Sequence, residues 1–269
     1  MKDKRDLTQE KDFSKIAKDL NNLIDMEFEK KVKKSLKTIK HALHYYSNPV
    51  ISSSFGKDSV VLIHLVHRID DSVPIIFNDT GVGFPETKKY MKKLEEKWEL
   101  NIDVVKPKQT FFEIVDEYGY PKTSRASKSG DPRQPKCCKI LKEEPMQRYI
   151  KKNDIDLNFV GLCAYEGNQR RWAYIRTGNA TYYHKTWDVI KSIPLIWWEL
   201  DDVWNYIDDH DIPKNPVYEK YDLDRTGCIT CSGHKNWKKS IAKYSQDLLF
   251  KIIKDKENIE PLEKYDKLQ

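Results

Sequence analysis

The sequence predicts an α/β fold in which a Rossmann-like parallel sheet is flanked by helices. Short β-branched and apolar runs alternate with segments whose apolar residues recur at helical spacing. Alternating strands and helices of this length favour a parallel sheet with right-handed crossovers. Polar loops follow the predicted strands, as expected where such a sheet binds a ligand at the carboxyl ends of its strands.

The predicted elements fall into three parts, residues 1–46, 47–235 and 236–269. Residues 8–46 contain a stripe of apolar residues at helical spacing and neither Pro nor Gly, which predicts an N-terminal helical extension. The main domain is expected over 47–235, and an irregular, basic segment follows it. Within the main domain the patterns predict strands at 49–51, 73–77, 102–105 and 157–162, helices at 60–69, 85–98 and 200–209, and a loop at 120–136.

Composition sets wide limits on function. The 269 residues are 39% hydrophobic, enough for one good core, and the net charge of +6 permits contact with polyanions without requiring it. The first residues, MKDKRDLTQEKDF, are charged throughout, and no apolar run approaches ~18–20 residues. We therefore expect a cytoplasmic protein with neither a signal peptide nor a membrane span.

The stretch ISSSFGKDSV predicts a strand-to-helix turn that binds phosphate. Such a turn directs backbone N–H groups and the positive end of the helix dipole at one point. Gly56 permits close approach to the main chain, and Lys57 adds a positive charge. An ordinary capped loop is the alternative, and the spacing differs from the P-loop pattern. The residues expected to bind the ligand here are Ser52, Ser54, Phe55, Gly56, Lys57, Asp58 and Ser59.

A second polar loop, Asn78-Asp79-Thr80-Gly81, follows the next predicted strand. The two loops should face one crevice at the edge of a parallel sheet. We expect Asp79 and Thr80 to contribute to the ligand site, with Asp79 holding a ribose or a metal. Capping of the next turn explains Asp79 about equally well.

The cysteines suggest a metal centre. Cys137 and Cys138 are adjacent, Cys228 and Cys231 form a Cys-x-x-Cys pair, and Cys163 stands alone. Disulfides are disfavoured in a cytoplasmic chain. Zinc usually takes two Cys-x-x-Cys pairs, whereas the corners of an iron–sulfur cluster lie further apart, so we favour a 4Fe-4S cluster over zinc. Buried structural cysteines are the alternative.

Taken together, these motifs resemble the sulfonucleotide reductases (APS and PAPS reductases) and their sulfurtransferase relatives of the PP-loop superfamily. The resemblance covers about residues 45–235, and its segments are SFGKDSVVLIHL, FNDTGVGFPET, CCKILKEEP, GLCAYEGNQRR and the block from 201 to 231. It implies an adenine nucleotide (ATP, APS or PAPS) on the first loop. It also implies a 4Fe-4S cluster near Lys142, with the ligands Cys137, Cys138, Cys228 and Cys231.

The sequence departs from the reductase pattern at two places. No cysteine follows Cys231, so the thiol with which the reductases attack sulfate is absent. In the segment beginning at Gly161, Cys163 stands where the family has an anion-binding arginine. Arg170 and Arg171 remain as candidates for a phosphate or sulfate clamp.

The main functional expectation is an ATP-using iron–sulfur sulfurtransferase that incorporates sulfur into nucleic acid, as in DNA phosphorothioation. Its catalytic residues would be Lys57, Asp58, Arg170 and Cys163, helped by Mg2+. Cys163 would carry a persulfide, and the favoured alternative is that it is merely packed at the end of its strand. The expected partners are a sulfur donor such as a cysteine desulfurase, other phosphorothioation proteins and DNA, and we expect a homodimer. The basic loop at 122–136 and the aromatic stretch at 172–187 offer surfaces for DNA.

Two alternatives remain open. The chain could be an APS or PAPS reductase-like enzyme whose thiol comes from Cys163 or from another molecule. It could instead be a cluster-bearing subunit that senses a nucleotide.

Overall fold

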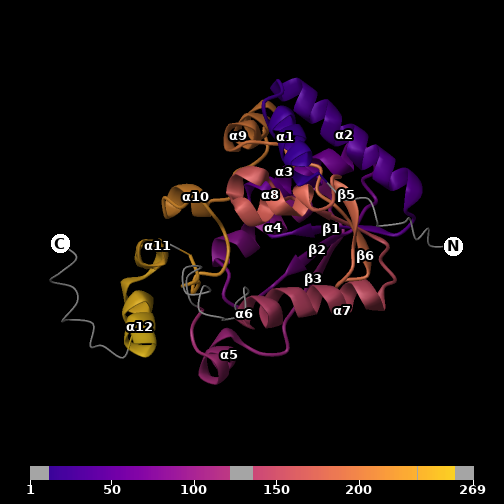
Figure 1. Cartoon of the computed structure of the whole chain (residues 1–269). Coiled ribbons are helices and arrows are strands. Elements are labelled where there is room, and N and C mark those ends of the chain that lie inside the picture. The colour runs from indigo at the N-terminus through magenta and orange to yellow at the C-terminus, as the bar shows by residue number, and fades with distance from the viewer. Residues whose placement is uncertain (1–11, 122–135, 235, 258–269) are drawn as a thin grey trace.

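The computed structural model describes residues 12–121, 136–234 and 236–257. In this part of the chain six strands form one sheet in the order β3-β2-β1-β4-β6-β5 (Figure 1). All neighbouring strands are parallel except β5, which runs antiparallel to β6. The strands are β1 Pro49–Ser53, β2 Ile75–Asn78, β3 Ile102–Val105, β4 Leu157–Val160, β5 Thr181–His184 and β6 Val189–Ser192.

Helices cover both faces of the sheet (Figure 1). Their bounds are α1 Phe13–Ile24, α2 Phe28–Tyr45, α3 Lys57–His67, α4 Pro85–Trp98, α5 Phe111–Tyr118, α6 Lys136–Cys138, the π-helix η2 Lys139–Glu143, α7 Glu144–Lys152, the 3-10 helix η3 Ala164–Glu166, α8 Asn168–Ile175, α9 Leu200–Asp209, α10 Val217–Lys220, α11 Trp237–Tyr244 and α12 Gln246–Glu257. In the described residues no helix is both long and apolar enough to cross a membrane.

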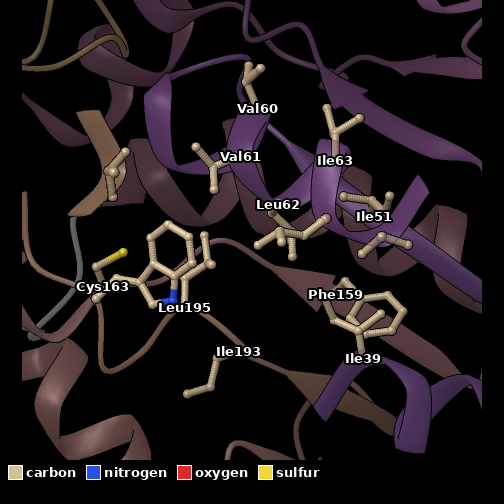
Figure 2. Packing of buried hydrophobic residues seen from close by; sticks show 14 of the residues in the cluster. Ile39, Ile51, Val60, Val61, Leu62, Ile63, Phe159, Cys163, Ile193 and Leu195 are labelled. Atoms are coloured by element: carbon tan, nitrogen blue, oxygen red, sulfur yellow. The ribbon is translucent and has the colours of Figure 1, made fainter. Parts of the chain in front are cut away.

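The side chains of β1 and β2 alternate between two hydrophobic clusters. Ile51 and Ile75 belong to the larger cluster, which packs the sheet against α3, α4 and α9 (Figure 2). Val50 and Ile76 belong to a smaller cluster with residues of α7 on the opposite face. Because neighbouring residues of a strand point to opposite faces, these strands read as continuous apolar runs, which is typical of a parallel sheet buried on both sides.

The structure confirms the predicted fold class and refines its elements. The β5–β6 hairpin was not predicted, and it adds an antiparallel edge to the sheet. The expected long N-terminal helix is two helices, α1 and α2, and both contribute to the larger cluster. The helix after β1 begins at Lys57, three residues before the predicted start, because the polar residues of the turn form its first turn.

The C-terminal segment is more regular than expected. It contains α11 and α12, whose apolar side chains form a small cluster of their own. Trp237, Ile241, Leu249 and Ile252 are buried in that cluster, and Tyr120 packs against it. Residues 122–135, most of the predicted basic loop, lie outside the described residues.

A buried ion pair ties α2 to the start of α9. Lys31 Nζ lies 2.6 Å from Asp202 Oδ2, and the two side chains are only 3% and 12% exposed. The Asp202 carboxylate also accepts the backbone N–H of Glu199 at the N-terminus of α9. One turn further along α2, Ser35 Oγ donates to the carbonyl oxygen of Pro194 and accepts from Trp198 Nε1. This polar contact fixes α2 against the larger cluster.

We predict that Lys31→Met lowers the free energy of unfolding by about 3–5 kcal/mol, because it leaves the Asp202 carboxylate buried without its cation. Urea denaturation would measure the change. The matched control is Lys214→Met, which breaks the exposed Lys214–Asp208 pair and should cost at most about 1 kcal/mol. Equal losses in the two variants would contradict the structural role of the buried pair.

Candidate site formed by the phosphate loop and four cysteines

The order of the strands places a crevice at the carboxyl ends of β1 and β4. From β1 the chain continues to β2 and β3 on one side, while β4 and β6 lie on the other, so the order reverses between β1 and β4. Ligands bind at such a switch point in open α/β sheets. Gly161, just after β4, allows the two loops to meet, because a Cβ at this position would lie 3.0 Å from the carbonyl oxygen of Asp58.

The loop from Ser52 to Ser59, the phosphate loop, leads from β1 into α3. Gly56 is the N-cap of α3 and provides no side-chain cap. Phe55 has a left-handed backbone (φ 54°), and its buried ring packs edge-on against Phe77. The loop thus directs the amide end of α3 into the crevice, the arrangement that binds anions.

Lys57 is buried within the loop (8% exposed) and its ammonium group is held from two sides. Nζ lies 3.3 Å from Asp58 Oδ2 and 3.5 Å from the carbonyl oxygen of Asp224. Burial acts to lower the pKa of Lys57, but the charge and hydrogen bond of Asp58, together with Tyr218 and Glu166, outweigh it, and the pKa is raised. Lys57 is therefore a permanent cation at the mouth of α3.

The Asp58 carboxylate is the centre of a second set of contacts. It accepts the Tyr165 hydroxyl at 2.7 Å and the Cys163 thiol at 3.6 Å, both at Oδ1. Cys163 is 0% exposed and belongs to the larger hydrophobic cluster (Figure 2). Burial, with the charge of Asp58, raises the pKa of Cys163 well above that of an ordinary thiol. Since the thiolate is the reactive form, the geometry favours the packed role over the persulfide carrier.

Several predicted ligand residues lie elsewhere or already have partners. Arg170 Nε lies 3.7 Å from Glu166 on the loop after β4, whereas Arg171 donates to Asn21 of α1. Ser52 Oγ donates to Asn158 of β4 at 2.7 Å. The structure thus places Arg170 at the edge of the crevice and directs Arg171 toward α1.

The remaining loop residues pack locally. Ser54 Oγ lies 3.4 Å from Ser59 Oγ, and the latter donates to the carbonyl oxygen of Gly56. Asp79 forms an ion pair of 2.8 Å with Lys88 and accepts the Gly81 N–H, which is the turn-capping role. Burial acts to raise the pKa of Asp79, but the hydrogen bonds from Lys88 and Gly81 lower it overall.

Four cysteines line one cavity beside this crevice. The cavity is bounded by Cys137, Cys138, Cys228 and Cys231, together with Phe111, Pro121, Leu141 and Lys142. The adjacent pair ends α6 and leads directly into the π-helix η2. A π-turn is wider than an α-turn and occurs often at functional sites. The backbone is therefore locally widened next to Cys137 and Cys138. An adjacent pair of this kind does not match the Cys-x-x-Cys spacing that is usual for zinc.

The second pair of cysteines is held against the loop after β2. Gly83 and Cys228 form an isolated antiparallel bridge, and the Ile229 N–H donates to the carbonyl oxygen of Val82 at 2.8 Å. Cys228 Sγ donates to Thr80 Oγ1 at 3.7 Å. Thr80, predicted as a ligand of the nucleotide, thus lies on the cysteine side of the crevice.

The electrostatics of the cavity favour the thiolate form of Cys138 and the charged form of Lys142. A hydrogen bond from Cys137 lowers the pKa of Cys138 to about 6, and the positive charges of Lys142 and Arg225 act in the same direction. The same bond raises the pKa of Cys137. The pKa of Lys142 is raised, first by the negative charge of Cys228. Four soft sulfur donors around one cavity suit zinc or an iron–sulfur cluster.

Among the described residues, no group of three or more His, Cys, Asp or Glu side chains is spaced to hold a single metal ion. The four cysteines share one cavity and are soft donors, but in the described residues their sulfur atoms are not grouped closely enough to hold one ion. The Mg2+ ion expected to assist Lys57 and Arg170 likewise has no such ligand group in the part of the chain that the structure describes.

Sequence reasoning missed the segment that joins the two halves of the site. This segment, residues 213–232 and here called the strap, contacts the phosphate loop at one end and supplies Cys228 and Cys231 at the other. Asn215 Nδ2 donates to the carbonyl oxygen of Phe55 at 2.9 Å, and Tyr218 accepts the Lys57 N–H at 2.8 Å. The only signal in the sequence was the block that resembles the reductases. That resemblance gave a role to Cys228 and Cys231 but none to Asn215 or Tyr218.

Comparison with protein families and curated proteins places this site in context. Residues 48–234 match the model of the phosphoadenosine phosphosulfate reductase domain. The chain is 31% identical over 191 residues to an adenosine 5'-phosphosulfate reductase of Staphylococcus haemolyticus, covering 70% of this chain and 72% of that protein. It is also 33% identical over 244 residues to an uncharacterized protein of Methanocaldococcus jannaschii, covering 86% of this chain but only 54% of the archaeal protein.

Solved structures show the same fold. A phosphoadenylyl-sulfate reductase from Candida auris, solved as a phosphate complex, aligns with a TM-score of 0.56 at 20% identity, over 83% of this chain and 96% of that one. An FMN adenylyltransferase from Candida glabrata in complex with ATP aligns with a TM-score of 0.54 at 12% identity, over 81% of this chain and 71% of that one. The Rossmann-like arrangement is therefore common to all three proteins.

We predict that Cys163 resists alkylation in the folded protein, because its thiol is buried and its pKa is raised. Iodoacetamide at pH 8, followed by peptide mass spectrometry, should label Cys163 only after the chain is unfolded in urea. Rapid labelling of Cys163 in the native protein would restore the persulfide-carrier hypothesis.

Proposed function

Because the chain belongs to the phosphoadenosine phosphosulfate reductase domain family, we propose that it binds a sulfonucleotide, APS or PAPS, and reduces it to sulfite with an external thiol. One observation carries the proposal: the amide end of α3, with Lys57, faces the crevice, and the strap joins this loop to the four-cysteine cavity. The proposal thus combines an anion site and a thiol-lined site within one crevice.

The binding role follows from the phosphate loop. The N–H groups at the start of α3 and the helix dipole stabilise a phosphate, and Lys57 adds a full charge. Tyr218 accepts the Lys57 N–H in the absence of a ligand. Gly56 is required here, because a Cβ at this position would lie 2.7 Å from Thr226 Oγ1. The space beside position 56 can therefore hold the strap or a ligand, but it cannot hold a side chain at position 56.

The relatives support the choice of substrate class. The Staphylococcus haemolyticus protein is named as an adenosine 5'-phosphosulfate reductase, and a Xylella fastidiosa protein that is 29% identical over 177 residues is named as a phosphoadenosine 5'-phosphosulfate reductase. The family therefore supports a sulfonucleotide enzyme. The sulfite assay described below, run with APS and with PAPS, distinguishes the two substrates.

The attacking thiol comes from another molecule in this proposal. No cysteine follows Cys231 in the sequence, and Cys163 is buried. An external thiolate attacks the sulfate sulfur, so an S–S bond forms as the S–O bond to the 5'-phosphate breaks, and AMP leaves from APS or adenosine 3',5'-bisphosphate from PAPS. A second thiol attacks the organic sulfur of this adduct and releases sulfite. Two thiols are oxidised to a disulfide, and the sulfate is reduced by two electrons.

We further propose that Cys137, Cys138, Cys228 and Cys231 hold a 4Fe-4S cluster, since these four sulfur donors line one cavity. When bound, the cluster supplies a redox-active centre beside the nucleotide. In the chain itself, Lys142 holds a positive charge against the thiolates, and Thr80 accepts the Cys228 thiol.

The ATP-using sulfurtransferase remains the second candidate. The observation that favours it is that residues 232–269 contain no cysteine that could act as the reductase thiol. The predicted sulfur donor, the phosphorothioation partners, DNA, Mg2+ and the homodimer belong to this candidate and stay predictions. The same is true of a nucleotide-sensing subunit, which would bind the nucleotide without turnover.

We predict that anaerobic protein with APS or PAPS and reduced thioredoxin yields sulfite. Lys57→Ala should lower the rate on the order of 100-fold or more, because it removes a preorganised cation from the phosphate site. The control Lys92→Ala removes an exposed charge from α4 and should leave the rate unchanged. Sulfite quantification measures the outcome. Pyrophosphate release from ATP, with no sulfite from either sulfonucleotide, would instead establish the second candidate.

We predict about four irons per chain in anaerobically purified protein, with a broad absorbance near ~400 nm. Cys138→Ser or Cys231→Ser should abolish both signals, whereas Lys57→Ala should keep them, because the loop and the cysteines come from separate segments. Iron analysis and absorbance spectra measure this. Stoichiometric zinc with no iron would refute the cluster.

A further inference from the structure

We propose that the Arg225 guanidinium binds the second oxyanion of the nucleotide, the sulfate or phosphate group attached to its α-phosphate. The inference rests on the proposed nucleotide site and deepens it, because it assigns the group that distinguishes a sulfonucleotide from AMP. Sequence reasoning gave that role to Arg170 and Arg171, which the structure places with Glu166 and with Asn21.

The backbone of the strap holds position 225 against the phosphate loop. The residue before it, Asp224, accepts Lys57 Nζ at its carbonyl oxygen, 3.5 Å away. The residue after it, Thr226, places Oγ1 2.7 Å from where a Cβ on Gly56 would lie. Arg225 is thus bracketed by two contacts with the loop that holds the α-phosphate in the proposed function.

The side chain of Arg225 extends toward the cysteines. Its NH2 atom lies 3.6 Å from where a Cβ on Gly227 would be, so the guanidinium lies against Gly227, the residue that precedes Cys228. Its positive charge also bears on Cys138 and on Lys142 across the cavity. Position 225 therefore lies on the strap between its contacts with the phosphate loop and the cysteine pair at 228 and 231, on the side where a group beyond the α-phosphate would extend in the proposed site.

Arg225 differs from Lys57 and Arg170 in its ion pairs. Lys57 is paired with Asp58, and Arg170 with Glu166. No ion pair joins Arg225 to an acidic side chain of the described residues, and its side chain is exposed. A guanidinium presents a planar pair of N–H donors that matches two oxygens of a tetrahedral anion. An arginine at this place with no ion pair to a described acidic residue is suited to sulfate or phosphate.

The test compares ligands with and without the second oxyanion. Isothermal titration of the anaerobic full-length protein with AMP, ADP and APS would give the three dissociation constants for wild type, Arg225→Ala, Arg225→Lys and the control Arg171→Ala. For Arg225→Ala we expect APS affinity to fall on the order of tenfold to 100-fold, as charge-assisted hydrogen bonds are lost, while AMP affinity is unchanged. The APS affinity of Arg225→Lys should lie between those of wild type and Arg225→Ala, because lysine keeps the charge but loses the planar pair of N–H donors. Arg171→Ala should match wild type for all three ligands.

The ADP arm identifies the source of the oxyanion. A parallel loss for ADP and APS supports a subsite that accepts phosphate and sulfate alike, and a loss for APS alone supports a sulfate subsite. Unchanged APS affinity in Arg225→Ala, equal losses for AMP and APS, or a wild type that binds APS no better than AMP would each overturn the proposal. Binding is measured without turnover, so absence of sulfite in the enzyme assay would refute the proposed reduction and leave this result standing. Iron content and thermal melting of both Arg225 variants show that they remain folded.

Discussion

The contact between the strap and the phosphate loop is the constraint on which the rest of the site depends. Asn215 donates to the carbonyl oxygen of Phe55, which stabilises the left-handed turn that leads into α3. Tyr218 accepts the first amide of that helix. Without this contact the buried Lys57 would lose the carbonyl partner that Asp224 provides, and the second pair of cysteines would have no fixed place relative to the loop.

The fold and the phosphate loop could be predicted because their signals are local. The apolar runs of β1 and β2 and the break at Gly56 follow from the periodicity of a few neighbouring residues. The β5–β6 hairpin escaped prediction because its strands have four residues each and their outer face is partly exposed. The division at α1 and α2 escaped prediction because the apolar stripe continues across Asp25 without Gly or Pro.

The site was less predictable, because its contacts join residues that are distant in the chain. Tyr165 and Cys163 converge on Asp58 from more than 100 positions away, and nothing in their local sequence indicates this. Arg171 follows Arg170 directly, yet a helix turns neighbouring side chains to different sides, so it reaches α1 instead of the crevice. The cysteine set was predictable from residue type, whereas the π-turn that positions Cys137 and Cys138 was not.

The course of the strap has a thermodynamic consequence. One segment carries Cys228 and Cys231 and also touches the loop at Phe55 and Lys57, so a ligand at either end orders the same backbone. If the proposed anion and the proposed cluster both bind, each restrains the same backbone, so the first to bind bears the loss of entropy and the second meets a segment that is already restrained. Linkage makes the effect reciprocal: the factor by which a filled cysteine cavity raises the affinity of the crevice for its anion is the factor by which the anion strengthens retention of the cavity's occupant.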